Sequence, residues 1–139
     1  KYMKQQKRRG PVPPAAAVQN TDRAAKYRNT PTERVTASGA VLRFDSQKEA
    51  RRYDHLTIRQ KAGEIHDLRL QVDFTLQEAY TDPEGRRVRA IRYRADFTYR
   101  ERDGRLVVED VKSKPTRTRE YLIKRKLMKE RRGIDITEV

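Results

Sequence analysis

The chain has no cysteine, and only 35% of its 139 residues are hydrophobic. The absence of cysteine excludes disulfides and thiolate metal sites, and it permits a reducing compartment such as the cytoplasm. No apolar run approaches the roughly 18 residues that a membrane-spanning helix needs, so we expect no membrane partner. There are only two histidines, His55 and His66, which stand alone in the sequence and are expected to be surface or structural residues.

Charged residues, in contrast, make up 39% of the chain. The 34 Lys and Arg outnumber the 20 Asp and Glu by 14, and the isoelectric point is about 10.4. Such an excess repels itself unless it meets an anionic partner, most commonly nucleic acid, with an acidic membrane surface as the main rival. A basic protein without a specific partner is the remaining alternative, because charge governs association and not fold.

The basic residues are concentrated near the start of the sequence. Residues 1–28 hold eight Lys and Arg against one acid, Asp22, together with three prolines and few large apolar side chains. This composition predicts a flexible basic arm over residues 1–25, followed by one domain over residues 26–139. The arm could follow phosphates, or it could be a solubilising tail.

The domain is expected to alternate between helices and strands. Ser46 and Glu49 have capping-box spacing and Gly63 is a natural stop, which predicts a helix over residues 46–62 after a short extended segment within 35–44. Strands are expected around residues 74–80, 87–99 and 106–112, then a helix over 117–132 and a strand over 134–139. The fold class is therefore α/β, a helix, a three-strand meander, a helix and a strand, with a mixed sheet flanked by helices. The last strand should return beside the third through a right-handed crossover.

Three residues on the predicted strands could carry chemistry. Asp110 and Lys112 are two residues apart, so they point to the same face of their strand, and Asp96 lies on the strand before. Two carboxylates suit Mg²⁺, which binds carboxylates, waters and substrate phosphates, and a lysine could neutralise charge that develops on the phosphate. The alternative is an exposed Asp110–Lys112 ion pair of little energetic weight.

The chemical hypothesis places a condition on the hairpin near Asp103 and Gly104. A two-residue loop there would pair residues whose numbers sum to 207, and Asp96 would then lie on the face opposite to Asp110. The two carboxylates share a face only if the sum is even, which needs a three- or five-residue loop or a bulge.

Several spaced blocks of this sequence resemble a known family. The blocks are FDSQKEARRY, IHDLRLQVDFTL, RYRADFTY, LVVEDVKSK and REYLIKRKLMKERRGIDITEV, and together they span about residues 26–139. They resemble an uncharacterised phage and prophage family that is similar to PD-(D/E)XK nucleases of the Holliday-junction resolvase and transposase-endonuclease type. The resemblance implies a restriction-endonuclease-like core.

The resemblance also assigns roles to residues. Asp96 matches the first metal-binding acid, Asp110 and Lys112 match the signature acid and lysine, and Glu49 matches an additional acid, although Glu49 also fits its capping role. The backbone carbonyl of Val111 would join the metal ligands. In this chain Ala95 stands where the superfamily name has proline, and Asp110 stands where glutamate is more usual. Gln71 would orient a catalytic carboxylate or satisfy buried backbone.

Further residues are expected to contact DNA. Arg92 and Arg94 share the face of Asp96 in an alternating strand, and the second helix with the residues before it carries a basic face. The expected contacts are Arg92, Arg94, Ser113, Lys114, Arg117, Arg119 and Lys124.

These observations lead to a metal-dependent DNA endonuclease as the main hypothesis. It would use Mg²⁺, or Mn²⁺ in its place, act on branched or double-stranded DNA as a homodimer, and work in the cytoplasm of a bacterial or phage-infected cell. A non-catalytic DNA-binding, packaging or recombination accessory protein on the same fold is the alternative. An RNA-binding protein is disfavoured because few aromatic residues cluster on one face for base stacking.

Overall fold

The computed structural model describes residues 31–139, so the predicted arm over residues 1–25 lies outside the described part. The described residues fall into two units, divided between Ala50 and Arg51, and each is described by itself. Within the described residues, no helix is long and apolar enough to cross a membrane.

The first unit contains a short β-hairpin. Strand β1 (Thr32–Val35) pairs antiparallel with β2 (Val41–Phe44), and the turn between them is closed by a hydrogen bond from the Thr36 N–H to the Ala40 carbonyl at 2.8 Å. Gly39 supplies the positive φ of +90° that this tight turn needs. The extended segment expected within residues 35–44 is thus the second strand of this hairpin.

Helix α3 (Gln47–Lys61) confirms the helix predicted over residues 46–62. The Glu49 N–H donates to the Ser46 hydroxyl at 3.2 Å, so Ser46 is the N-cap that the sequence indicated. Gly63, at φ +77°, lies just beyond the C-terminal end. Residues 51–61 of this helix belong to the second unit.

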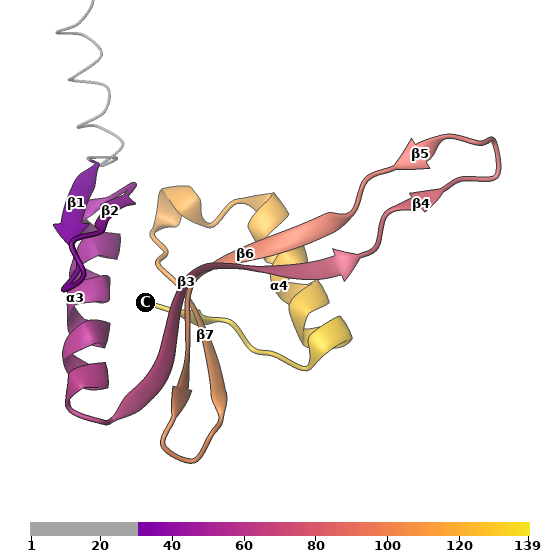
Figure 1. Cartoon of the computed structure of the whole chain (residues 1–139). Coiled ribbons are helices and arrows are strands. Elements are labelled where there is room, and N and C mark those ends of the chain that lie inside the picture. The colour runs from indigo at the N-terminus through magenta and orange to yellow at the C-terminus, as the bar shows by residue number, and fades with distance from the viewer. Residues whose placement is uncertain (1–30) are drawn as a thin grey trace, which may run out of the picture. The chain divides into compact units, whose positions relative to one another are not determined.

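The second unit is built on a four-stranded mixed sheet (Figure 1). Its strand order is β3 (Ile65–Gln77), β6 (Ile91–Glu101), β7 (Leu106–Asp110) and β8 (Thr137–Glu138). The first three strands form an antiparallel meander, and β8 returns parallel to β7 after helix α4 (Arg119–Arg132). The predicted α/β class and the return of the last strand beside the third are confirmed.

Some element boundaries differ from the predictions. Strand β3 starts at Ile65 and not near residue 74. The sequence carries no signal for its first half, because those residues are mostly exposed and polar and lack a clear apolar alternation. Strand β7 ends at Asp110, and a 3-10 turn, η1 (Lys114–Thr116), precedes α4. Helix α4 begins at Arg119 and not at residue 117, because the Thr118 hydroxyl caps it by accepting from the Tyr121 N–H at 3.1 Å.

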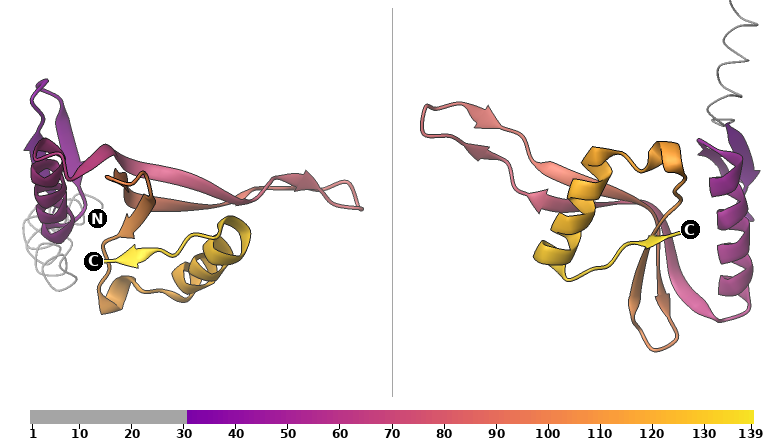
Figure 2. Two further views of the ribbon diagram at one scale, coloured as in Figure 1. Left: turned by 90° about the horizontal axis from the view of Figure 1, so that it is seen from below. Right: turned by 180° about the vertical axis from the view of Figure 1, so that it is seen from behind.

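The strand expected over residues 87–99 is divided in two. Strand β5 (Arg87–Val88) pairs only with β4 (Tyr80–Thr81), and β6 begins three residues later. The turn predicted from Asp82 to Gly85 is present, since the Asp82 carboxylate accepts from the backbone N–H groups of Glu84 and Arg86. A two-stranded ribbon therefore extends from the sheet at the start of β6 (Figures 1 and 2).

Helix α4 covers one face of the sheet and closes the main hydrophobic core. Its buried residues, Tyr121 and Met128, pack with side chains from β3, β6 and β7 and with Ile136, which directly precedes β8. The members contributed by the three strands are Leu76, Tyr93, Ala95 and Val108. A period of three to four residues between the apolar positions of α4 is what an amphipathic helix needs to pack on a sheet.

The opposite face of the sheet buries a charge. Glu109 is 1% exposed, and both of its carboxylate oxygens accept hydrogen bonds from the Arg52 guanidinium on α3. The Tyr99 hydroxyl donates to the same carboxylate. Burial, together with that hydrogen bond, raises the pKa of Tyr99 to about 12, so it remains a donor at neutral pH. Residues 51–61 of α3 are thus attached to the face opposite to α4.

The side-chain alternation of β6 changes face in the middle of the strand. Tyr93 and Ala95 pack with Val108 beneath α4. Strict alternation would put Tyr99 there too, but Tyr99 bonds Glu109, the neighbour of Val108, and so lies on the opposite face. The prediction that residues 91 to 99 keep one apolar face was therefore wrong.

The change occurs where Asp96 lies opposite Gln71. On either side of these residues Leu70 pairs with Phe97 and Val72 pairs with Ala95, while Gln71 adopts a left-handed conformation at φ +54°. A left-handed residue turns an extended strand out of its regular pleat, which resets the faces of the residues that follow. This irregularity isolates Asp96 from the alternation of its own strand.

We predict that Arg52→Ala lowers the free energy of unfolding by about 2 kcal/mol, because the buried Glu109 carboxylate loses its only cationic partner among the described residues. Urea denaturation at neutral pH measures the effect. Arg69→Ala is the matched control, since its ion pair with Asp67 is exposed and should change stability by less than about 0.5 kcal/mol. Equal losses in the two variants would contradict a structural role for the buried pair.

Candidate active site

Asp110 and Lys112 lie where β7 ends beside β8. The Val139 N–H donates to the Asp110 carbonyl and the Lys112 N–H donates to the Val139 carbonyl, both at 3.0 Å. These two bonds keep the chain extended for two residues beyond the last residue of β7. Asp110 and Lys112 consequently share a face, as the sequence predicted, and their charged groups lie 3.4 Å apart.

The loop between β6 and β7 satisfies the condition placed on it by the sequence. Glu101 and Arg105 are hydrogen-bonded across the hairpin, and Phe97 pairs with Glu109, so residue numbers sum to 206 along the ladder. The loop therefore has three residues, 102 to 104, and ends at Gly104 with φ +88°. Continued by one residue beyond the Phe97–Glu109 pair, the even sum places Asp96 opposite Asp110, which is the register that a shared site needs.

Asp96 binds the backbone at the end of β7. Its Oδ2 accepts from the Val111 N–H at 2.8 Å, and its Oδ1 lies 3.5 Å from the Gln71 amide nitrogen, a long contact. Gln71 thus lies near a site carboxylate, and both of its predicted roles, orienting a carboxylate and satisfying buried backbone, stay predictions. Val111 contributes its N–H to the contact with Asp96, and a role of its carbonyl as a metal ligand stays a prediction.

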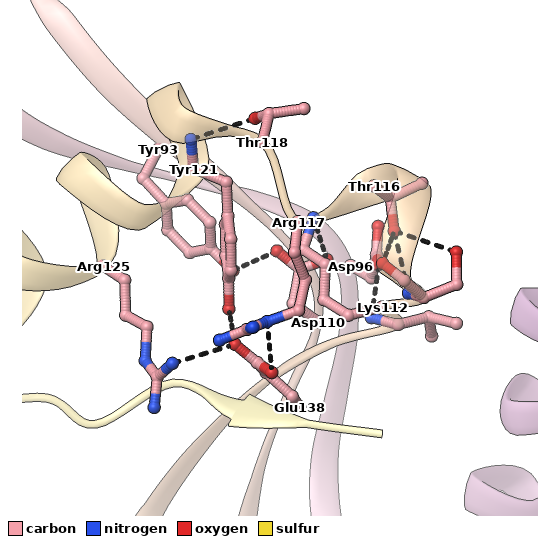
Figure 3. A network of polar contacts seen from close by, with 12 residues as sticks. Tyr93, Asp96, Asp110, Lys112, Thr116, Arg117, Thr118, Tyr121, Arg125 and Glu138 are labelled. Carbon is pink, nitrogen blue, oxygen red and sulfur yellow. Dashed lines mark hydrogen bonds and ion pairs between the residues drawn. The ribbon is translucent and has the colours of Figure 1, made fainter.

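Asp110 is buried and held by two donors (Figure 3). The Tyr93 hydroxyl donates to its Oδ2 at 2.6 Å, and the Lys112 ammonium faces its Oδ1. Burial, followed by the hydrogen bond to Asp110, raises the pKa of Tyr93 far above its ordinary value. Tyr93 is therefore a fixed proton donor to this carboxylate and not a base.

Lys112 is also partly buried, with 15% of its side chain exposed. Its ammonium group lies 4.1 Å from the centre of the Tyr121 ring, within the range of a cation–π interaction. Asp110 and the Tyr121 ring together fix the ammonium between β7 and α4. The position of the ammonium group is therefore fixed by the fold before any ligand binds.

Glu138 completes the network from the neighbouring strand (Figure 3). It pairs in register with Asp110, accepts from the Tyr121 hydroxyl at 2.8 Å, and forms ion pairs with Arg117 and Arg125 at 3.1 Å each. Burial opposes ionisation of Glu138, but the Tyr121 hydrogen bond and the two guanidinium groups outweigh it, and its pKa is lowered. Burial and the same hydrogen bond raise the pKa of Tyr121.

The sequence did not indicate Tyr93, Tyr121 or Glu138 as site residues. In the sequence, Tyr93 and Tyr121 are members of the apolar faces of a strand and a helix, and nothing in the pattern indicates what their hydroxyl groups bind. The available clue was the requirement that a buried tyrosine hydroxyl find a partner. Glu138 could be found only from the parallel pairing of β7 with β8.

Glu49 belongs to the first unit, where it is buried in the first turn of α3 and its N–H bonds Ser46. The half of the capping box in which the Glu49 N–H donates to the Ser46 hydroxyl is confirmed. Its proposed participation in the site stays a prediction.

The predicted placement of two DNA contacts is corrected, while the contacts themselves stay predictions. Arg92 and Arg94 were expected on the Asp96 face, but they alternate with Tyr93 and Ala95 and so lie on the face away from α4 and Asp110. The Arg94 guanidinium makes two hydrogen bonds to Asp73, at 2.8 and 3.0 Å. The break in alternation at Asp96 is the reason for the difference.

The remaining predicted contacts surround the start of α4. Ser113 and Thr116 bond one another across η1, Arg117 pairs with Glu138, and Lys124 pairs with Glu120 at 3.4 Å. Lys114 and Arg119 are exposed and have no acidic partner among residues 31–139. These two are the cations of the group that are available to an anionic ligand.

The donor set suits a hard divalent cation. Asp96 and Asp110 offer carboxylate oxygens from adjacent strands, and Mg²⁺ is commonly held by one or two carboxylates with water and phosphate. Among the described residues there is no group of three or more His, Asp or Glu that could hold a metal. Any metal here would therefore depend on waters, backbone or substrate for its other ligands.

The fold and this site define a mixed α/β domain with one acid in the middle of β6 and an acid and a lysine at the end of the adjacent strand β7. The chain belongs to the family described as "Protein of unknown function (DUF1064)", whose model matches residues 24–137. No curated protein and no solved structure gives a significant match. The function must therefore be argued from the residues of the site.

We predict that Tyr93→Phe lowers the free energy of unfolding by about 1–2 kcal/mol, because the buried Asp110 carboxylate loses a hydrogen-bond donor. Tyr121→Phe is the matched control, since Glu138 keeps its two arginine partners and the loss should be smaller. Urea denaturation of both variants measures the difference. A larger loss for Tyr121→Phe would contradict the stronger dependence of Asp110 on its tyrosine.

Proposed function

We propose that this protein is a metal-dependent endonuclease that hydrolyses phosphodiester bonds in DNA, with Asp96, Asp110 and Lys112 as its catalytic residues. The observation that carries the proposal is the even register of β6 and β7, together with the hydrogen bond to Asp96 from the N–H of Val111, which lies between Asp110 and Lys112 in the chain. The net charge of +14 supports a polyanionic substrate. The resemblance to PD-(D/E)XK nucleases adds branched DNA as the favoured substrate.

The division of roles follows from the contacts. Asp96 and Asp110 would hold Mg²⁺ or Mn²⁺, which supplies a bound water of lowered pKa and polarises the phosphate. Tyr93 keeps Asp110 oriented through its hydroxyl hydrogen bond. Lys112, held between Asp110 and the Tyr121 ring, would place a positive charge beside the phosphate oxygens where negative charge develops.

The proposal includes an assembly and a setting. Cutting two strands of a junction in a paired manner requires two active sites, so we propose a homodimer. A phage-related role in the cytoplasm of a bacterial or infected cell accompanies the nuclease hypothesis.

One feature favours a second candidate function, a non-catalytic DNA-binding or packaging accessory protein. Both oxygens of Asp110 already have partners, Tyr93 and Lys112, so the ion pair could serve stability alone. The two functions differ in whether removal of these charges abolishes a reaction.

The decisive experiment uses labelled linear, nicked, flapped and four-way-junction DNA, with Mg²⁺, Mn²⁺ or EDTA. We predict metal-dependent cleavage by the wild type, and a loss of at least about 100-fold in Asp96→Asn, Asp110→Asn and Lys112→Ala. DNA binding by the two Asp variants should be equal or stronger, because a negative charge near the phosphate is removed. Lys112→Ala should retain metal binding.

Asp135→Asn and Lys126→Ala are matched controls that change the same charges on the exposed surface, and both should cleave at the wild-type rate. Circular dichroism checks that each variant is folded. Tight DNA binding without cleavage in the presence of either metal would contradict the nuclease proposal and support the accessory role. Wild-type cleavage by any of the three site variants would remove that residue from the catalytic set.

A further inference from the structure

The ribbon formed by residues 77–92 extends beyond the four-stranded sheet. Strands β4 and β5 pair only with each other, with Tyr80 opposite Val88 and Thr81 opposite Arg87. The views of Figures 1 and 2 agree that α4 lies over β3 and β6 and leaves the tip of the ribbon uncovered. A two-stranded hairpin in water is only marginally stable by itself, so an uncovered ribbon is a candidate binding element.

The charges of the ribbon are unequally neutralised. It has four arginines and three acids, and Arg86 pairs with both Asp82 and Glu84. Arg87 and Arg89 are exposed and have no acidic partner within residues 31–139. The fourth arginine, Arg92, lies near Asp73, but that carboxylate is bound by Arg94.

The two free arginines lie close together on one strand of the ribbon. Arg87 lies in β5, opposite Thr81, and Arg89 directly follows Val88, the last residue of that strand. The side chain of Arg87 projects to the face opposite to Val88, whereas Tyr80, which pairs with Val88, lies on the Val88 face and is 46% exposed. We call the face of Arg87, together with the neighbouring Arg89, the basic face of the ribbon.

The spacing of the basic face fits a phosphate backbone. Residues two apart on a strand are about 7 Å apart, which is twice the roughly 3.4 Å axial spacing of phosphates on one strand of B-form DNA. Guanidinium groups at this spacing can bind phosphates of nearby nucleotides, and their planar donors suit phosphate oxygens.

We propose that the basic face of the ribbon, formed by Arg87 and Arg89, binds backbone phosphates of double-stranded DNA, outside the catalytic site. The inference rests on the proposed function for the identity of its polyanion. It adds a binding element that works through phosphates and carries no sequence preference of its own.

Binding of the full chain to a fluorescein-labelled duplex, followed by anisotropy over a series of salt concentrations, tests the inference. Arg87→Gln/Arg89→Gln should weaken binding about tenfold and lower the slope of log K against log salt by about two units, because two phosphate contacts are lost. The variant removes no described ion pair, so its thermal unfolding should match that of the wild type.

Two controls locate the effect. Arg102→Gln/Arg105→Gln removes the same charge from the loop between β6 and β7, at the other end of β6, where Glu64, Glu101 and Asp103 balance the arginines. Tyr80→Ser alters the opposite face of the ribbon. Both should bind the duplex with the wild-type affinity and salt slope.

An unchanged salt slope in Arg87→Gln/Arg89→Gln, or an equal loss in the Arg102→Gln/Arg105→Gln control, would overturn the inference. Weakening by Tyr80→Ser alone would overturn it in favour of a contact through the apolar face. A wild type that binds the duplex through the ribbon but never cleaves would refute the nuclease and leave the ribbon contact supported. A wild type that cleaves with no effect of the ribbon variant would refute the ribbon contact alone.

Discussion

The even register between β6 and β7 is the constraint on which the site depends. Side chains on a strand alternate between faces, so a hairpin loop of two residues in place of three would move Asp110 to the other side of the sheet from Asp96. It would also exchange Val108, now under α4, with the buried charge of Glu109. Core packing and site geometry thus require the same loop length. Selection for a stable core would preserve this register even in a protein without catalysis.

Burial of two adjacent carboxylates imposes a second constraint. Glu109 and Asp110 project to opposite faces of β7, and each forms an ion pair with one cation and accepts a hydrogen bond from one tyrosine hydroxyl. Glu109 is paired with Arg52 and accepts from Tyr99, while Asp110 is paired with Lys112 and accepts from Tyr93. A buried carboxylate without such partners would cost several kcal/mol. Asp110 and Glu109 are both buried, at 4% and 1% exposed, but their surroundings differ, because Asp110 lies at the end of its strand beside Lys112, whereas Glu109 is held by Arg52 on α3. This difference in surroundings makes Asp110 the candidate for chemistry and Glu109 a structural residue.

The sequence predicted both helices and the common face of Asp110 and Lys112, because these depend on local signals. Ser46 and Gly63 set the limits of α3, and the spacing of Asp110 and Lys112 places both on one face whatever the rest of the sheet does. It could not predict the loss of alternation at Asp96, since that depends on the left-handed backbone of Gln71 across the ladder. The same limit applies to Tyr93, Tyr121 and Glu138, which meet the site through pairing between residues far apart in sequence. The nuclease activity, the metal and the dimer stay predictions.

Strands β3 and β6 both connect the ribbon to the sheet, and the length of β6 limits how the ribbon and the site could act on one DNA molecule. At about 3.3 Å per residue, Arg87 lies at most about 30 Å from Asp96 along the chain. That length approaches one turn of B-form DNA, roughly 34 Å. A duplex could therefore contact the ribbon about one turn from the bond at the site, on a stretch that undergoes no chemistry. Because interactions made equally in the bound and transition states raise affinity without speeding the chemical step, the ribbon would contribute to binding and not to turnover. The register shift of β3 against β6 between Thr75 and Gln77 lies between the two regions, so the ladder is irregular where the ribbon leaves the sheet.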